Sequence, residues 1–197
     1  MNPMALEGIR VLDVTQVMAG PFCAMQLCDM GADVIKVEPP GGDSSRHMAG
    51  AVGDDSPSFN AVNRGKRGIV LDLQTDAGRA TLRQLAARSD ILVENFRPGV
   101  MERLGLHYEA LSADHPALIY ASISGYGQTG PHARKGGFDL VAQGASGLMS
   151  ITGEPAGVSD RREQRRAGGG VSERHVSVLV DGEACHPPRY GRIRSPC

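Results

Sequence analysis

Residues 9–38 read IRVLDVTQVMAGPFCAMQLCDMGADVIKVE, and this stretch decides the fold class. Its opening, residues 9–15, is short, β-branched and almost wholly apolar, which is typical of a strand covered on both faces. Residues 22–30 predict a helix, because Pro21 in the first turn has no N–H to leave unpaired there. Residues 33–38 follow at once as a second strand, so the stretch predicts a βαβ unit with parallel strands.

The same alternation continues along the chain, interrupted by a long polar loop that carries one short helix. Strand and helix in turn, with short connections, predict the α/β class: a Rossmann-like parallel sheet with helices on both faces. Ligands of such sheets bind at the carboxyl ends of the strands. Further strands are predicted over residues 68–73, 90–95 and 118–125, and helices over residues 59–62, 75–87, 98–104, 109–113 and 138–149.

Composition limits the classes of function. The 197 residues are enough for one domain, or for one domain and a fragment of another. A net charge of −1 gives no reason to expect nucleic acid or an anionic membrane as a partner. No run reaches the roughly 18 apolar residues of a membrane span, and the start has no secretory pattern. We therefore expect a cytoplasmic protein in which the four cysteines stay reduced.

Two loops after predicted strands carry the types of residue that bind ligands. Residues 125–131, GYGQTGP, suit a loop whose backbone a ligand can approach closely, although an ordinary tight connection has the same pattern. Residues 95–99, NFRPG, place an amide, an aromatic ring and a cation together, as a nucleotide site would need. The alternative there is a turn with a solvated arginine. The chain has neither a GxGxxG nor a Walker motif, and the six histidines lack the spacing of metal ligands.

Six blocks between about Met4 and Pro155, in order and without a gap, resemble the opening half of the family III CoA-transferases. This CaiB/BaiF-type family includes formyl-CoA transferases and α-methylacyl-CoA racemases. The blocks read ALEGIRVLDVTQVMAGPFC, GADVIKVEPPGGD, NRGKRGIVLDL, DILVENFRPGVMERLGL, ALIYASISGYGQTGP and GFDLVAQGASGLMSITGEP.

The resemblance implies a CoA-transferase, an enzyme that moves CoA from an acyl-CoA to a carboxylic acid. It also implies that two copies of the chain form an interlocked homodimer. Coenzyme A or its thioester would be a substrate, with no covalently bound cofactor and no metal. An aspartate would attack the thioester and form an anhydride, which is covalent catalysis by a carboxylate. The positions that match CoA-contacting residues of the family are Val17, Ala19, Leu71, Asn95 and Arg103.

Three departures from the family pattern narrow this expectation. Met18 stands where formyl-CoA transferases often have glutamine, and Pro39 stands where they have an arginine near the adenine. A formyl-CoA specialist is therefore not expected. Phe138 occupies the position of the catalytic histidine of racemases, so transfer is favoured over α-proton exchange, which needs that base. A racemase-like enzyme and an inactive CoA-binding fragment remain the alternatives.

The chain changes character after the family-like domain, residues 1–158. Residues 159–197 are rich in Arg, Gly and Pro, and the resemblance implies a nucleophilic aspartate followed by a glycine and a long apolar helix. Asp160 comes too early for it, and Asp181 is followed by GEACHPP, which cannot begin such a helix. The catalytic aspartate is thus not identified. We interpret this tail as the product of a shifted reading frame. A disordered tail and a basic segment for nucleic acid are the alternatives.

Overall fold

The computed structural model describes residues 3–48, 56–148, 179–180 and 183–184. The chain divides into two units, Met1–Gly136 and Gly137–Cys197, which we describe separately. The expected domain boundary at residue 158, the two candidate aspartates and all of the tail except residues 179–180 and 183–184 lie outside the described residues.

The first unit is built on a five-stranded sheet in which every pairing is parallel, so the predicted α/β class is confirmed. The strand order β3-β2-β1-β4-β5 places the first strand in the centre, as in Rossmann-type folds. The strands are β1 (Arg10–Asp13), β2 (Asp33–Glu38), β3 (Arg67–Val70), β4 (Ile91–Glu94) and β5 (Ile119–Ser122).

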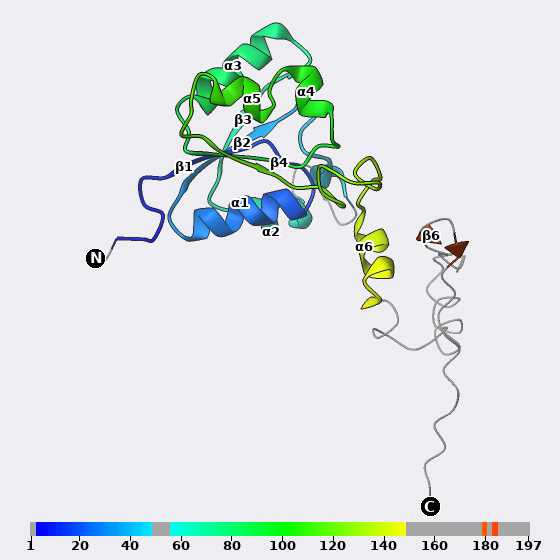
Figure 1. Ribbon diagram of the computed structural model, residues 1–197. Coiled ribbons are helices and arrows are strands. Elements are labelled where there is room, and N and C mark those ends of the chain that lie inside the picture. The colour runs from blue at the N-terminus through cyan, green and yellow to red at the C-terminus, as the bar shows by residue number, and fades with distance from the viewer. Residues whose placement is uncertain (1–2, 49–55, 149–178, 181–182, 185–197) are drawn as a thin grey trace, which may run out of the picture. The chain divides into compact units, whose positions relative to one another are not determined.

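Helices cover both faces of this sheet (Figure 1). One face carries α1 (Ala19–Asp29) and α2 (Pro57–Asn63), and the opposite face carries α3 (Asp76–Ala86), α4 (Val100–Leu104) and α5 (Tyr108–Ser112). A 3-10 turn, η1 (Ser44–His47), follows β2.

Alternate strand residues supply two apolar cores, because successive side chains of a strand point to opposite faces. Leu12 and Leu92 pack with Leu82 of α3. Val11 and Val93 pack with Ala24 of α1. The near-continuous apolar runs of the strands are thus explained by burial on both sides.

The predicted elements are present, and their ends differ for local reasons. The first helix begins earlier than predicted, at Ala19, so Pro21 is its third residue. The third strand ends at Val70 instead of residue 73, because the chain turns at Asp72. The Asp72 carboxylate accepts the Gln74 N–H at 2.9 Å, and its carbonyl accepts the Thr75 N–H at 3.1 Å. The Thr75 side chain then caps α3, as the sequence predicted.

In the second unit, the described residues include α6 (Asp139–Ala145) and an antiparallel pair of two-residue strands, β6 (Leu179–Val180) and β7 (Glu183–Ala184). Helix α6 lies within the predicted range 138–149, whose last residue is outside the described part of the chain, and none of its residues is buried. Within the described part of the chain, no helix has the length and apolarity needed to cross a membrane.

Candidate functional site

A buried ion pair lies where the central strand β1 ends, on the face covered by α1 and α2. The Lys66 ammonium lies 2.8 Å from Asp13 Oδ2, and both side chains are at most 1% exposed. Lys66 also donates to the carbonyl of Pro21 at 2.8 Å and to Asn63 Oδ1 at 3.0 Å. Burial lowers the pKa of Lys66, and the neighbouring Asp13 carboxylate opposes that shift. This pair ties β1, the start of α1 and the end of α2 together.

A second buried pair joins β2 to the loop that follows it. Lys36 Nζ lies 2.9 Å from Asp43 Oδ2, and the side chains are 2% and 0% exposed. Asp43 Oδ1 accepts the Ser45 N–H at 2.9 Å and the Ser45 hydroxyl at 2.8 Å. Burial alone would raise the pKa of Asp43, but the bonds from Ser45 and the pair with Lys36 outweigh it and hold that pKa below its ordinary value.

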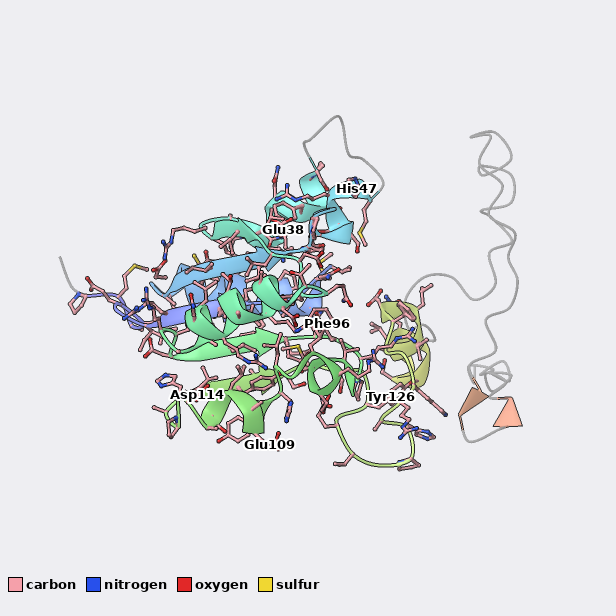
Figure 2. The ribbon with its side chains drawn as sticks, turned by 90° about the horizontal axis from the view of Figure 1, so that it is seen from above. Glu38, His47, Phe96, Glu109, Asp114 and Tyr126 are labelled. Atoms are coloured by element: carbon pink, nitrogen blue, oxygen red, sulfur yellow. The ribbon has the colours of Figure 1, made fainter. Side chains whose placement is uncertain are left out.

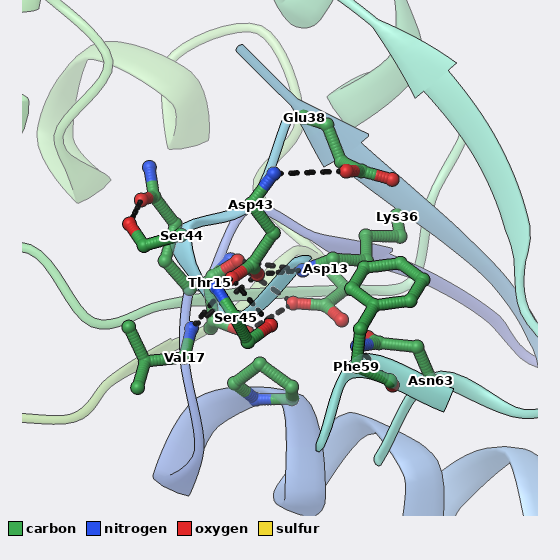
Figure 3. A network of polar contacts seen from close by, with 12 residues as sticks. Asp13, Thr15, Val17, Lys36, Glu38, Asp43, Ser44, Ser45, Phe59 and Asn63 are labelled. Carbon is green, nitrogen blue, oxygen red and sulfur yellow. Dashed lines mark hydrogen bonds and ion pairs between the residues drawn. The ribbon is translucent and has the colours of Figure 1, made fainter. Parts of the chain in front are cut away.

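These groups, together with Asn95, hold the backbone of the first loop, residues 15–17 (Figure 3 shows the contacts of Asp13, Lys36 and Asp43). Thr15 donates its N–H to Asp13 at 3.0 Å, and its carbonyl accepts Lys36 Nζ at 2.9 Å. The side-chain amide of Asn95 pairs with the Gln16 backbone, accepting its N–H at 2.9 Å and donating to its carbonyl at 2.8 Å. The Val17 N–H donates to Asp43 Oδ1 at 3.1 Å.

The first loop also carries the backbone outlier of the described chain. Val17 has φ 69°, and among the described residues it is the one non-glycine residue with positive φ. Such a conformation costs about 1–3 kcal/mol and persists only where the surroundings enforce it. Gly20 lies just beyond, and a Cβ there would come within 2.3 Å of the Thr15 side chain. The loop is therefore closely packed as well as hydrogen-bonded.

The carboxylate at the end of β2 is neutralised within the site. Glu38 forms a bidentate pair with Arg46, with N–O distances of 2.7 and 2.8 Å, and it accepts the Asp43 N–H at 2.9 Å. The hydrogen bond from Arg46 is the main cause that lowers the pKa of Glu38. The Arg46 guanidinium in turn stacks over the Phe59 ring at 3.6 Å. A carboxylate engaged in this way is not available for a ribose hydroxyl, as the acid of dinucleotide-binding folds is.

An apolar pocket of ≈ 150 Å³ opens between the carboxyl ends of the strands and helix α4. Its apolar lining includes Val14, Val37, Leu71, Phe96 and Leu104, and its polar lining is made by Gln16, Glu38, Asp72 and Gln74. Figure 2 shows the labelled Phe96 and Tyr126 toward the end of the sheet opposite to Asp114. The apolar lining and ring suit the flat face of a nucleobase.

A polar cavity of ≈ 540 Å³ adjoins this pocket and shares Gln74, Val100 and Leu104 with it. Arg79 and Arg103 supply its positive charge. Arg79 pairs with Asp76, whereas the Arg103 guanidinium forms no ion pair with any residue that the structure describes. An arginine fork of this kind matches phosphate oxygens.

Gly78 lies against the turn at Asp72, just before residues that line the two cavities. A Cβ at this position would lie 2.0 Å from the carbonyl oxygen of Asp72, so only glycine allows this turn to pack on the start of α3. Arg79 then holds the turn by donating to the carbonyls of Leu73 at 3.0 Å and Gln74 at 2.8 Å.

The glycine-rich loop 125–131 lies on the other side of α4, beside a third cavity of ≈ 240 Å³. The buried Glu94 accepts hydrogen bonds from the Ser122 hydroxyl and, at 2.8 Å, from the Phe96 N–H, while Gln128 donates to Ser122. Burial raises the pKa of Glu94, and these hydrogen bonds offset only part of the rise. Arg97 is exposed and lines the same cavity.

The five residues expected to contact CoA lie around the carboxyl edge of the sheet, in different surroundings. Leu71 lines the apolar pocket and Arg103 the polar cavity. Asn95 and Val17 are engaged within the first loop, and Ala19 is the exposed first residue of α1. Contact of these residues with CoA stays a prediction.

Sequence reasoning missed the four buried ions beneath the first loop: Asp13, Lys36, Asp43 and Lys66. A signal was present for two of them. Asp13 and Lys36 interrupt strands that are otherwise apolar, and a charge in such a strand requires a buried partner. The partners come from loops, so their identity depends on the tertiary fold.

Comparison with known proteins gives one consistent result. The model of a family described as CoA-transferase family III matches residues 6–165. The acetyl-CoA:oxalate CoA-transferase of Acetobacter aceti is 49% identical over 156 residues, covering 79% of this chain and 40% of that enzyme. The succinyl-CoA:glutarate CoA-transferase of Homo sapiens is 46% identical over 158 residues, covering 79% and 36%.

A crystal structure from Brucella suis, of a CaiB/BaiF family protein, has the same fold with a TM-score of 0.74 at 44% identity. The match covers 79% of this chain and 42% of that one. The chain thus spans less than half the length of the relatives that it matches.

Proposed function

This chain belongs to CoA-transferase family III, and we propose that it supplies the part of a CoA-transferase that binds the nucleotide end of an acyl-CoA. The observation that carries the proposal is the pair of adjoining cavities at the carboxyl edge of the sheet. One is apolar and bordered by Phe96, and the other is polar and lined by Arg103. CoA presents an adenine ring and phosphates side by side, so its two chemistries fit the two cavities.

The reaction follows from the family and requires groups beyond this nucleotide site. An aspartate attacks the thioester carbonyl and expels the CoA thiolate, which leaves an acyl anhydride on the enzyme. The CoA thiolate then attacks the aspartyl carbonyl of this anhydride, which releases the donor acid and leaves CoA on the enzyme as an aspartyl thioester. The acceptor carboxylate displaces CoA from this thioester to form a second anhydride, and the CoA thiolate attacks its acyl carbonyl, which releases the new acyl-CoA and frees the aspartate. Asp160 and Asp181 lack the sequence context of the family's nucleophile, and we propose that neither of them acts as the nucleophile. The 197-residue chain should therefore bind CoA without exchanging thioesters.

Transfer remains favoured over epimerisation of α-methylacyl groups. Phe138, at the position of the racemase histidine, is 67% exposed and precedes the first residue of α6. A phenyl ring can neither accept nor donate the α-proton. Incubation of an α-methylacyl-CoA in deuterated water should therefore leave its α-carbon unlabelled.

Isothermal titration of CoA into the purified chain tests the proposal. Arg103→Met should weaken CoA binding by about 10- to 100-fold, since a hydrogen bond to a charged group contributes about 1.5–3 kcal/mol. Arg88→Met removes another exposed arginine, next to β4 at its amino end, and should leave the Kd unchanged. The proposal fails if millimolar CoA does not bind, or if both variants weaken binding equally.

A further inference from the structure

Asp43 is a fully buried carboxylate for which the proposed chemistry has no direct use. It lies between two segments that are distant in sequence, the first loop and the start of η1 (Figure 3). Its oxygens accept hydrogen bonds from Val17 and Ser45 and lie against the Lys36 ammonium. A buried ion pair of this kind is weak in net stability, since desolvation offsets much of the attraction. The pair therefore calls for an explanation other than stability.

We propose that Asp43, balanced by Lys36, is a positioning residue that sets the first loop in its CoA-binding geometry through the Val17 amide. The inference rests on the proposed function and extends it to residues outside the two cavities.

The geometry of Val17 supports this role. A β-branched residue in the left-handed region does not stay there unaided. The Val17 N–H lies 3.1 and 3.3 Å from the two oxygens of Asp43, so the carboxylate holds the peptide at the residue where the chain turns. Gln16 precedes this turn and lines the apolar pocket, and Ala19 follows it as the first residue of α1. A change in the backbone conformation of Val17 would therefore move both Gln16 and Ala19.

Lys36 stabilises the ionised form of Asp43 together with the hydrogen bonds from Ser45, and it also binds the first loop. Its ammonium lies 2.9 Å from Asp43 and donates to the Thr15 carbonyl, also at 2.9 Å. Lys36 therefore binds the carbonyl of Thr15, and Asp43 binds the N–H of Val17. These two residues lie on either side of Gln16, whose backbone is bound by Asn95. A hydrophobic pair in their place could fill the space, but it would leave both backbone groups without partners.

A matched pair of double variants of the full 197-residue chain separates positioning from charge. K36M/D43N removes both charges and keeps a side-chain oxygen that can accept the Val17 N–H. K36M/D43A removes both charges and the acceptor. Neither variant leaves a buried ion unpaired. K36M/D43A also removes the acceptor of the Ser45 N–H and hydroxyl, so it should melt at a lower temperature than K36M/D43N, and the two are compared at a temperature at which both are fully folded. Three quantities are measured for each: the Kd for CoA, the hydrogen-exchange rate of the Val17 amide, and the melting temperature.

Both variants lose the Lys36 donor to the Thr15 carbonyl, so the contrast between them isolates the acceptor of Val17. We expect K36M/D43A to bind CoA about tenfold more weakly than K36M/D43N. The Val17 amide should exchange about tenfold faster in K36M/D43A than in K36M/D43N. The proposal is overturned if the two variants bind CoA alike, if Val17 exchanges at the same rate in both, or if Ser45→Ala, which loses a hydrogen bond to Asp43 but keeps the acceptor of Val17, weakens CoA binding as much as K36M/D43A does. Absence of CoA binding by the unaltered chain is a different result, because it overturns the proposed function itself.

Discussion

The loop after β1 and the loop after β5 end at the same edge of the sheet, but they are held in opposite ways. Residues 15–17 have their peptide groups bound by the buried side chains of Asp13, Lys36 and Asp43 and by the half-buried amide of Asn95. Residues 125–131 are mostly exposed, and their side-chain connection to the core runs from Gln128 through Ser122 to Glu94. Gly127 and Gly130 have positive φ with open space around them, whereas a Cβ on Gly20 would collide with Thr15.

This difference indicates which part of the site is preset. The first loop has its geometry before any ligand arrives, because each hydrogen bond comes from a side chain that is itself buried or paired. The glycine-rich loop can adjust, since glycines with free space around them allow several backbone conformations. The carboxylates near the two loops also differ. The pKa of Asp43 and that of Glu38, on the side of the first loop, are lowered, whereas the pKa of Glu94, on the side of the glycine-rich loop, is raised.

The largest effect should come from breaking the ion pair beneath the first loop. Lys66→Met leaves Asp13 buried without its counter-ion, and it should lower the free energy of unfolding by about 3–5 kcal/mol. Arg67→Met removes the neighbouring residue's exposed pair with Asp33, and it should cost less than about 1 kcal/mol. Urea denaturation measures the free energy of unfolding of both variants. Equal losses would show that the buried pair contributes no more to stability than the exposed pair does.

The contributions of Glu94 and Glu38 to the free energy of unfolding should change with pH in opposite directions. The folded chain binds the Glu94 proton more tightly than the unfolded chain does, so the contribution of Glu94 to stability is greatest below its unfolded pKa of about 4.3 and is lost as pH rises through the folded pKa. Glu38 behaves in reverse: its contribution is present above the unfolded pKa and is lost as pH falls through the lowered folded one.

The measurement is the free energy of unfolding of Glu94→Gln and Glu38→Gln relative to the unaltered chain, from pH 3.5 to 8. The difference for Glu94→Gln should shift in favour of the variant as pH rises, and the difference for Glu38→Gln should shift in favour of the unaltered chain. If the two differences changed with pH in the same direction, the raised pKa of Glu94 and the lowered pKa of Glu38 could not both be right.

The smallest effect is expected at the tip of the glycine-rich loop. Gln128→Ala removes an exposed donor to Ser122, and it should change the free energy of unfolding by less than about 0.5 kcal/mol. A thermal melt that shifts by several degrees would show that this loop is as firmly held as the first one.

The sequence sufficed for the order of strands and helices, because apolar runs and turn residues are local signals. The resemblance to the family singled out Leu71 and Arg103, which line the two cavities, and their contact with CoA stays a prediction. The sequence could not show that Asn95 binds the Gln16 peptide, since those residues are 79 positions apart. The positive φ of Val17 had no signal either, because a valine gives no local reason for that conformation and the acceptor that holds it comes from another loop.

The firmly held first loop also has a thermodynamic consequence for recognition. Ordering the backbone of one residue costs about 1–2 kcal/mol of conformational entropy. For residues 15–17 this cost is met during folding, so it is absent from the binding step. The association of CoA with this part of the site should therefore be a single kinetic event whose rate rises linearly with CoA concentration, without a slower rearrangement behind it.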